Sequence, residues 1–95
     1  MKISEHLMTG KENATSGKAL AYLLGMDLRE VTKGIERERR SGIPICASSN
    51  GKNPGFYLAA NKAEMAAYCQ SLFHRAGELH KTRNECLKTI DKLPD

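Results

Sequence analysis

The most reactive side chains of the sequence are its cysteines and histidines, and their spacing forms no recognisable chemical site. Cys46, Cys69 and Cys86 lie far apart, and His74 and His80 are six positions apart. A zinc site needs ligands three or four positions apart on a helix, or tight cysteine pairs. A nucleophile needs a nearby base and an acid that orients it. We therefore expect no metal, no cofactor and no enzymatic activity, and reduced, mostly buried thiols.

The basic residues are the second set that can do chemistry. The chain has 15 Lys and Arg against 11 Asp and Glu, a formal net charge of +4 over 95 residues. Residues 1–60 carry nine basic and six acidic residues, whereas residues 61–95 carry six and five. The excess in the first part permits a polyanionic partner, and the positions of the charges must decide whether one is expected.

Four of these cations share one side of a helix predicted over residues 27–40. Helical spacing brings Arg29, Lys33, Arg37 and Arg40 onto one face, with Glu36 at its edge. Arginine and lysine on such a face bind guanine edges or phosphates of a duplex. The alternative is a solvated helix whose acidic side chains pair with its own cations.

Further duplex contacts are predicted around this helix. Threonine on the same helix adds a base or phosphate contact, and the free amides at the start of the preceding helix hold a phosphate. A turn-forming segment after the helix would hold another phosphate. The residues predicted to make these contacts are Thr32, then Thr15, Ser16 and Lys18, and finally Lys52 and Asn53.

Local signals predict where two helices begin. Thr15 or Ser16 begins a helix that ends at Gly25, because hydroxyls cap first turns and glycine adopts the left-handed conformation that ends helices. Asp27 and Glu30 form a capping box that begins the next helix.

Apolar residues at helical spacing predict the faces that these helices bury. Gly34 lies inside the second helix, where it costs about 1 kcal/mol against alanine, and a close helix–helix contact would justify it. Ile3 and Leu7 predict a short helix near the N-terminus. The expected inward residues are Ala19, Leu20, Leu23 and Leu24 in the first helix, and Leu28, Val31 and Ile35 in the second.

A hairpin is predicted after the second helix, which we expect to end at Ser41 and Gly42. Residues 43–47 alternate as a half-buried strand does, residues 48–55 are turn-forming, and residues 56–59 return as the second strand.

The chain from residue 61 is predicted to form one helix of about 30 residues, spanning about 45 Å. It begins at a capping box, Asn61 to Glu64. Its apolar residues follow a 3–4 repeat, as in the seam of a coiled coil. Positions seven apart are Met65, Leu72, Leu79, Cys86 and Leu93, and the intermediate positions are Cys69, Ala76, Arg83 and Ile90.

The sequence therefore predicts two domains. Residues 1–60 form a mainly α, α+β body, and residues 61–95 form a dimerisation element. A lone helix that folds back over the body is the alternative. The residues expected to hold two copies together are Met65, Leu72, Leu79, Cys86 and Ile90.

Residues 15–58 resemble the winged helix-turn-helix family, and are particularly similar to its small prophage-type bacterial members. The matching features are Thr-Ser-x-x-Ala-Leu, Leu-Gly-Met-Asp, Val-x-x-x-Ile-x-x-x-Arg, Gly-Ile-Pro-Ile and Gly-Phe-Tyr-Leu. The resemblance implies a recognition helix from Asp27 to Arg40, a two-stranded wing hairpin whose loop runs from Ser48 to Gly55, and double-stranded DNA as ligand. Gly34 and the acidic residues of the recognition helix depart from that pattern.

The function expected from these features is binding of double-stranded DNA by a cytoplasmic homodimer, with no membrane span and no small-molecule ligand. Its role would be that of a transcriptional regulator or of a phage-type accessory protein. The alternative is a protein-interaction module that uses the same scaffold and long helix without binding DNA. Binding of single strands or RNA would need exposed stacking aromatics, for which Tyr57 is the candidate near the wing.

Overall fold

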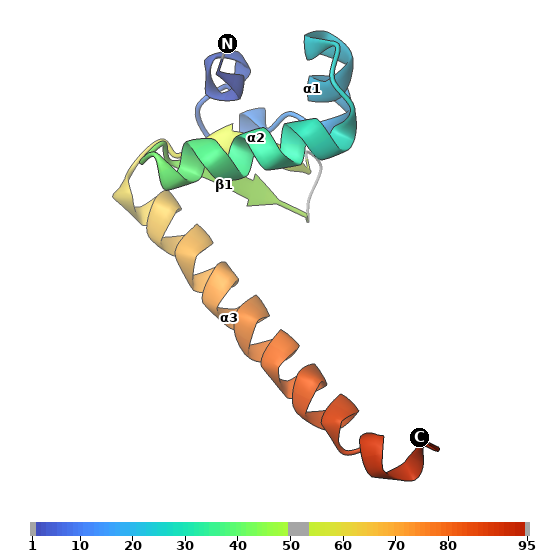
Figure 1. Cartoon of the computed structure of the whole chain (residues 1–95). Coiled ribbons are helices and arrows are strands. Elements are labelled where there is room, and N and C mark those ends of the chain that lie inside the picture. The colour runs from blue at the N-terminus through green and yellow to red at the C-terminus, as the bar shows by residue number, and fades with distance from the viewer. Residues whose placement is uncertain (1, 50–53, 95) are drawn as a thin grey trace. The chain divides into compact units, whose positions relative to one another are not determined.

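The computed structural model describes residues 2–49 and 54–94 of the chain (Figure 1). It divides into two compact units, Met1–Met65 and Ala66–Asp95. The described part is mostly helical, with a two-stranded antiparallel sheet and a long C-terminal helix, which confirms the predicted α+β class. The elements are the 3-10 helices η1 (Ile3–His6) and η2 (Lys11–Asn13), the helices α1 (Gly17–Leu24) and α2 (Leu28–Arg40), the strands β1 (Ile45–Ser48) and β2 (Gly55–Leu58), helix α3 (Lys62–Leu87) and the 3-10 helix η3 (Ile90–Lys92).

The predicted caps fix the boundaries of α1 and α2. The Ser16 hydroxyl accepts a hydrogen bond from the Ala19 amide at 3.1 Å, and Gly25 ends α1 with a φ of 63°. The Asp27 carboxylate accepts from the Glu30 amide at 2.8 Å, and the Glu30 carboxylate accepts from the Asp27 amide at 3.4 Å. These bonds confirm both predicted helix starts, and the short turn between the helices brings α1 and α2 into contact.

Apolar residues of η1, α1, α2 and β1 form the core of the first unit. Leu20 of α1 and Val31 and Ile35 of α2 are fully buried, as predicted. Leu23 and Leu28 were predicted to be inward and are 67% and 49% exposed. Leu23 is exposed because α1 has only eight residues and contacts α2 along one side, so that its apolar stripe is wider than the surface that covers it. Leu28 is the first residue of α2. The buried apolar cluster consists of Ile3, Leu7, Leu20, Val31, Ile35 and Ile45.

The hairpin pairs β1 with β2 in the register Ile45 with Leu58 and Ser48 with Gly55. Strand β1 begins two residues later than predicted, at Ile45. The other edge of β2 bonds to the segment before α1, because the Leu58 amide donates to the Met8 carbonyl at 2.9 Å and isolated bridges join β2 to residues 9 and 15. Strand β2 therefore lies between β1 and the N-terminal segment.

Gly34 is explained by η1. A Cβ atom at position 34 would collide with Cδ1 of Ile3, a buried residue of the core. The predicted close contact therefore exists, but its partner is a 3-10 turn near the N-terminus instead of a long helix.

Glu38 of α2 is hydrogen-bonded to η1, the 3-10 turn that contacts Gly34. Its carboxylate accepts the backbone amides of Ile3 and Ser4, each at 2.8 Å. Partial burial by itself raises the pKa of this carboxyl. The hydrogen bonds from the Ser4 and Ile3 amides and the Ser4 hydroxyl, together with the charge of Lys2, more than offset that effect, and the pKa of Glu38 lies below its ordinary value.

Helix α3 begins as predicted and ends earlier. The Asn61 side chain accepts from the Glu64 amide at 2.9 Å, while the Glu64 carboxylate accepts from the Ala60 amide. The predicted helix of about 30 residues is instead a helix of 26 residues that ends at Leu87. The Thr89 hydroxyl donates to the Cys86 carbonyl at 2.7 Å, and the chain then turns into η3.

The substitution Gly34→Ala should destabilise the protein by about 1 kcal/mol, because the cost of overpacking exceeds the gain in helix propensity. Ile3→Val removes the colliding Cδ1 atom, so Gly34→Ala should cost less in that background than in the wild type. Thermal unfolding of the four chains measures this coupling. A Gly34→Ala chain as stable as the wild type would contradict the close contact.

The substitution Glu38→Gln should destabilise the protein by about 1–2 kcal/mol at neutral pH, because it weakens two charge-assisted hydrogen bonds. A lowered native pKa means that the stabilisation is complete above the ordinary value of 4.5 and disappears as the pH falls through the native pKa. The difference between wild type and variant should therefore shrink in strong acid. Chemical unfolding at several pH values tests this, with exposed Glu5→Gln as control; a difference independent of pH would show that the charge is not what matters.

Candidate nucleic-acid interface

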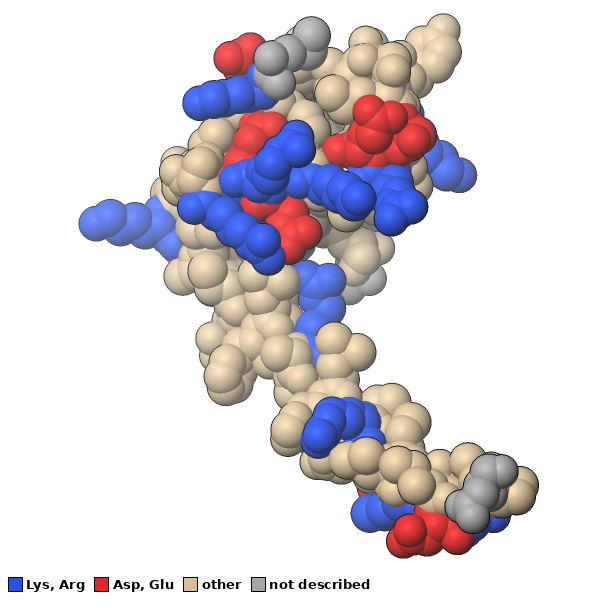
Figure 2. Space-filling view, in the orientation of Figure 1, with Lys and Arg blue, Asp and Glu red and all other residues tan. Residues whose placement is uncertain are grey.

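The outward face of α2 carries the basic residues predicted for DNA. In Figure 2 Lys and Arg side chains gather over this helix, with acidic side chains among them. Arg29, Lys33 and Arg37 are exposed. Within the described part of the chain, none of these three forms an ion pair or a hydrogen bond through its side chain. They are therefore available to bind an anion.

Each acidic residue of α2 forms a hydrogen bond or an ion pair with another group of the same chain. Glu30 accepts the Asp27 amide in the capping box, and Glu38 accepts the amides of η1. Glu36 pairs with Arg40 at 2.6 Å, although both side chains remain more than half exposed. A surface pair of this kind is weak, so Arg40 can be released to a stronger anion. The predicted alternative of self-paired charges thus applies to Arg40 and not to the other three cations of the face.

Arg39 has a different role, because it holds α2 to the hairpin. Its Nε donates to the Ile45 carbonyl at 2.8 Å, and its guanidinium lies 6.0 Å from the centre of the Phe56 ring. This arginine was not among the predicted DNA contacts.

Some of the other predicted DNA contacts, from Thr15 to Thr32, are used by the fold, and the rest can bind a ligand. Thr15 is partly buried, and its backbone amide and carbonyl both bond to Phe56 of β2. The Ser16 hydroxyl is the cap of α1, whereas Lys18 is exposed. The Thr32 hydroxyl donates to the Leu28 carbonyl at 3.0 Å, which leaves its oxygen able to accept.

The wing residues Lys52 and Asn53 lie outside the described residues. Tyr57, the aromatic residue considered for stacking on single strands, is 4% exposed on β2. Tyr57 lies on the buried side of the hairpin and is therefore not available to stack on a base.

Two apolar side chains on α1 were not predicted to be exposed together. Tyr22 is 88% exposed, and Leu23 beside it is also exposed. The apolar periodicity of the sequence indicated Leu23 as a core residue, and Tyr22 carried no motif. No local pattern distinguished this exposed pair from an ordinary helix core.

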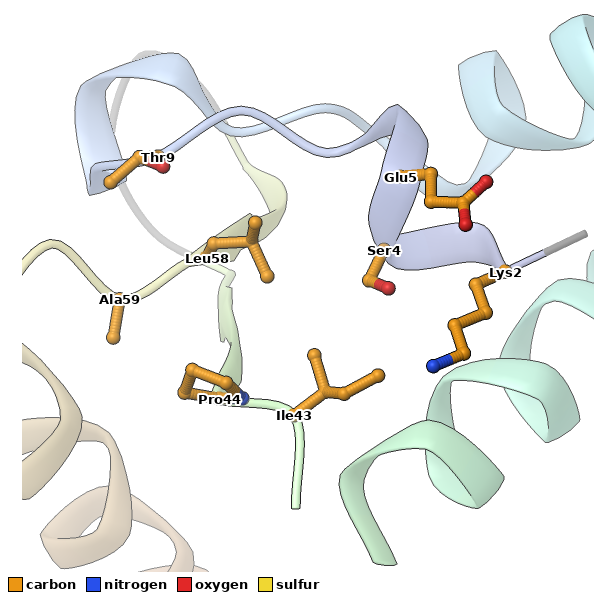
Figure 3. Close-up of a pocket in the computed structure, with 8 residues that line it drawn as sticks. All are labelled: Lys2, Ser4, Glu5, Thr9, Ile43, Pro44, Leu58 and Ala59. Carbon is orange, nitrogen blue, oxygen red and sulfur yellow. The ribbon is translucent and has the colours of Figure 1, made fainter. Parts of the chain in front are cut away.

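A shallow hollow of about 450 Å³ lies between η1, the start of the hairpin and the end of β2 (Figure 3). The side chains of Ile43 and Leu58 point into it, with Lys2 and Glu5 on the η1 side. It contains no pairing of a nucleophile with a base. Within residues 2–49 and 54–94, no group of three or more His, Cys, Asp or Glu side chains is arranged to hold a metal ion.

The predicted dimerisation residues fall into three settings. Leu72, Leu79 and Cys86 are exposed on α3. Met65 belongs to the first unit, where its Sδ lies 3.7 Å from the buried Cys46 Sγ. Ile90 lies beyond α3, in η3, because the helix ends early.

The thiols are more exposed than predicted. Cys46 is buried in β1, but Cys69 and Cys86 are both exposed on α3. The expectation of mostly buried thiols was wrong because α3 leaves almost all its side chains uncovered, Tyr68 being its one buried residue.

Comparison with known proteins gives no relative: no protein-family model, no curated protein and no solved structure matches the chain. None of the helices in the described ranges is long and apolar enough to span a bilayer. The arrangement of the residues themselves is therefore the basis for assigning a function.

Proposed function

We propose that this protein binds double-stranded DNA as a winged helix-turn-helix protein, with α2 as its recognition helix. The observation that carries the proposal is the exposed face of α2, on which Arg29, Lys33 and Arg37 have no acidic partner among the described residues. Cations on the outer side of a helix that is buried along its inner side are suited to the major groove, which admits one helix.

The order of elements supports the same proposal. Helix α1, a tight turn at Gly25, helix α2 and a hairpin follow one another within the first unit. In this arrangement the first helix of the pair crosses the backbone and the second reads base edges, while a loop after it reaches the sugar–phosphate chain. Lys18, exposed near the start of α1, can add a phosphate contact.

The cellular role that fits this ligand is regulation of transcription or an accessory function on DNA. The protein has no predicted catalytic group for cutting or joining strands, so its effect would come from occupying a site. Specificity would come from contacts of arginine or lysine with guanine and of Thr32 with a neighbouring base. Affinity would come mainly from phosphates and would therefore depend on salt.

A protein-interaction module is the second candidate, and the exposed Tyr22 and Leu23 on α1 are the observation that favours it. Exposed aromatic and aliphatic side chains are typical anchors of protein interfaces. A protein that binds through this pair would not need the cations of α2. Substitutions at the two surfaces therefore separate the candidates.

Each of Arg29→Ala, Lys33→Ala and Arg37→Ala should weaken binding to random duplex by about tenfold at low salt, since each removes a cation whose phosphate contact releases a counterion. Fluorescence anisotropy on random duplex at low salt measures the affinity. A substitution that removes a phosphate contact should also reduce the salt dependence by about one counterion. Lys92→Ala, in η3, is the matched control and should leave the affinity unchanged.

Absence of duplex binding by the wild type at low salt would end the DNA proposal. Unchanged binding by the three variants would show that another surface holds the duplex. Selection from a random duplex pool identifies the DNA sequence that the wild type prefers. The double variant Tyr22→Ala, Leu23→Ala should select the same sequence. A wild-type chain that selects no duplex at all, but binds a protein and loses it on substitution of Tyr22 and Leu23, would favour the protein-interaction candidate.

A further inference from the structure

The second unit exposes an apolar stripe that nothing in its own chain segment covers. Leu72, Phe73, Leu79 and Leu87 are exposed large hydrophobic residues of this unit. The ion pairs of the unit, Glu78 with Lys81 and Glu85 with Lys88, lie at helix positions away from the stripe. An exposed apolar surface beside a charged one marks an interaction site.

The spacing of the stripe is the same when it is read from either end. The stripe follows positions 69, 72, 76, 79, 83 and 86, which are separated by three, four, three, four and three residues, with Phe73 and Leu87 beside it. A second copy that runs in the opposite direction therefore meets the stripe layer by layer. The layers pair Cys69 with Cys86, Leu72 with Arg83, and Ala76 with Leu79, each across the two copies.

We propose that α3 binds a second copy of this chain in an antiparallel pair with this register. Arg83 is the residue that decides the direction. A parallel pair would place the two Arg83 side chains in one layer, where their like charges repel. The antiparallel pair places each Arg83 against a leucine, over which its aliphatic stem packs while its guanidinium reaches water.

The same register fits small residues against large ones. Ala76 faces Leu79 of the other copy, and the reciprocal contact lies in the adjacent layer. Symmetric pairs of this type are the commonest assembly of soluble chains. Met65 and Ile90 lie outside this pairing, because Met65 contacts Cys46 in the first unit of its own chain and Ile90 follows the end of α3.

Crosslinking of the exposed cysteines tests the direction of the pair. A short bismaleimide should join two wild-type chains through Cys69 and Cys86. Either Cys69→Ser or Cys86→Ser alone should abolish the crosslinked dimer, because each bond needs one cysteine of each kind. The two variants unfolded together and refolded as a mixture should recover it. Within one chain the two thiols are about 25 Å apart along the helix, beyond such a reagent.

Control variants and the mass of the chain in solution complete the test. A double variant lacking both thiols shows whether Cys46 contributes, and circular dichroism shows that each variant is folded. Crosslinking of Cys69→Ser or Cys86→Ser by itself would overturn the antiparallel register in favour of a parallel pair. A monomeric mass for the wild type in sedimentation would overturn pairing altogether, and Leu79→Asp should give that mass if the proposal is correct.

These measurements use no DNA, so their failure is distinct from failure of the proposed function. The Arg29→Ala, Lys33→Ala double variant should crosslink as the wild type does. A chain that binds duplex but remains monomeric would retain the proposed ligand and lose the proposed partner.

Discussion

The position of α2 depends on two neighbouring charged side chains that bond to backbone groups of other elements. Glu38 accepts two amides of η1, and Arg39 donates to the Ile45 carbonyl of β1. Charge-assisted bonds of this kind are stronger than neutral ones. Together with the contact between Gly34 and Ile3, they fix the rotation of the helix about its axis. That rotation determines which cations face outward.

The three acidic residues of α2 each form a bond within the protein. Glu30 and Glu36 are exposed, but Glu30 and Glu38 accept backbone amides, and Glu36 pairs with Arg40. Their charges remain in the field of the helix, but they do not pair with the cations in the middle of the face. Intramolecular bonding thus separates a structural set of charges from one available to a ligand.

The sequence predicts the parts of this fold whose signals are local. Ser16, Gly25 and the Asp27–Glu30 box act within a few residues, and all three were predicted with the correct roles. The role of Glu38 could not be predicted, because its partners lie 34 and 35 positions away. It was identified in the sequence only as an acidic departure from a basic helix.

Apolar periodicity gave the direction of each buried face but not its width. Val31 and Ile35 are buried as their spacing indicates, whereas Leu28 at the first turn of α2 is half exposed. The width depends on how much neighbouring surface the other elements supply, which is a property of the whole fold. The same limit applies to the candidate site: helical spacing placed Arg29 and Lys33 on one face, but not whether the adjacent acids would neutralise them.

The second unit obeys a different constraint from the first. Its ion pairs join exposed side chains three residues apart, and such pairs contribute little to stability. Isolated helices are marginal in water, so a helix that leaves Leu79 and Phe73 exposed gains most of its stability by covering them. If a second copy supplies that cover, folding of the distal part of α3 and association are linked equilibria. The cationic face and the apolar stripe belong to different units, so each could be lost without destroying the other.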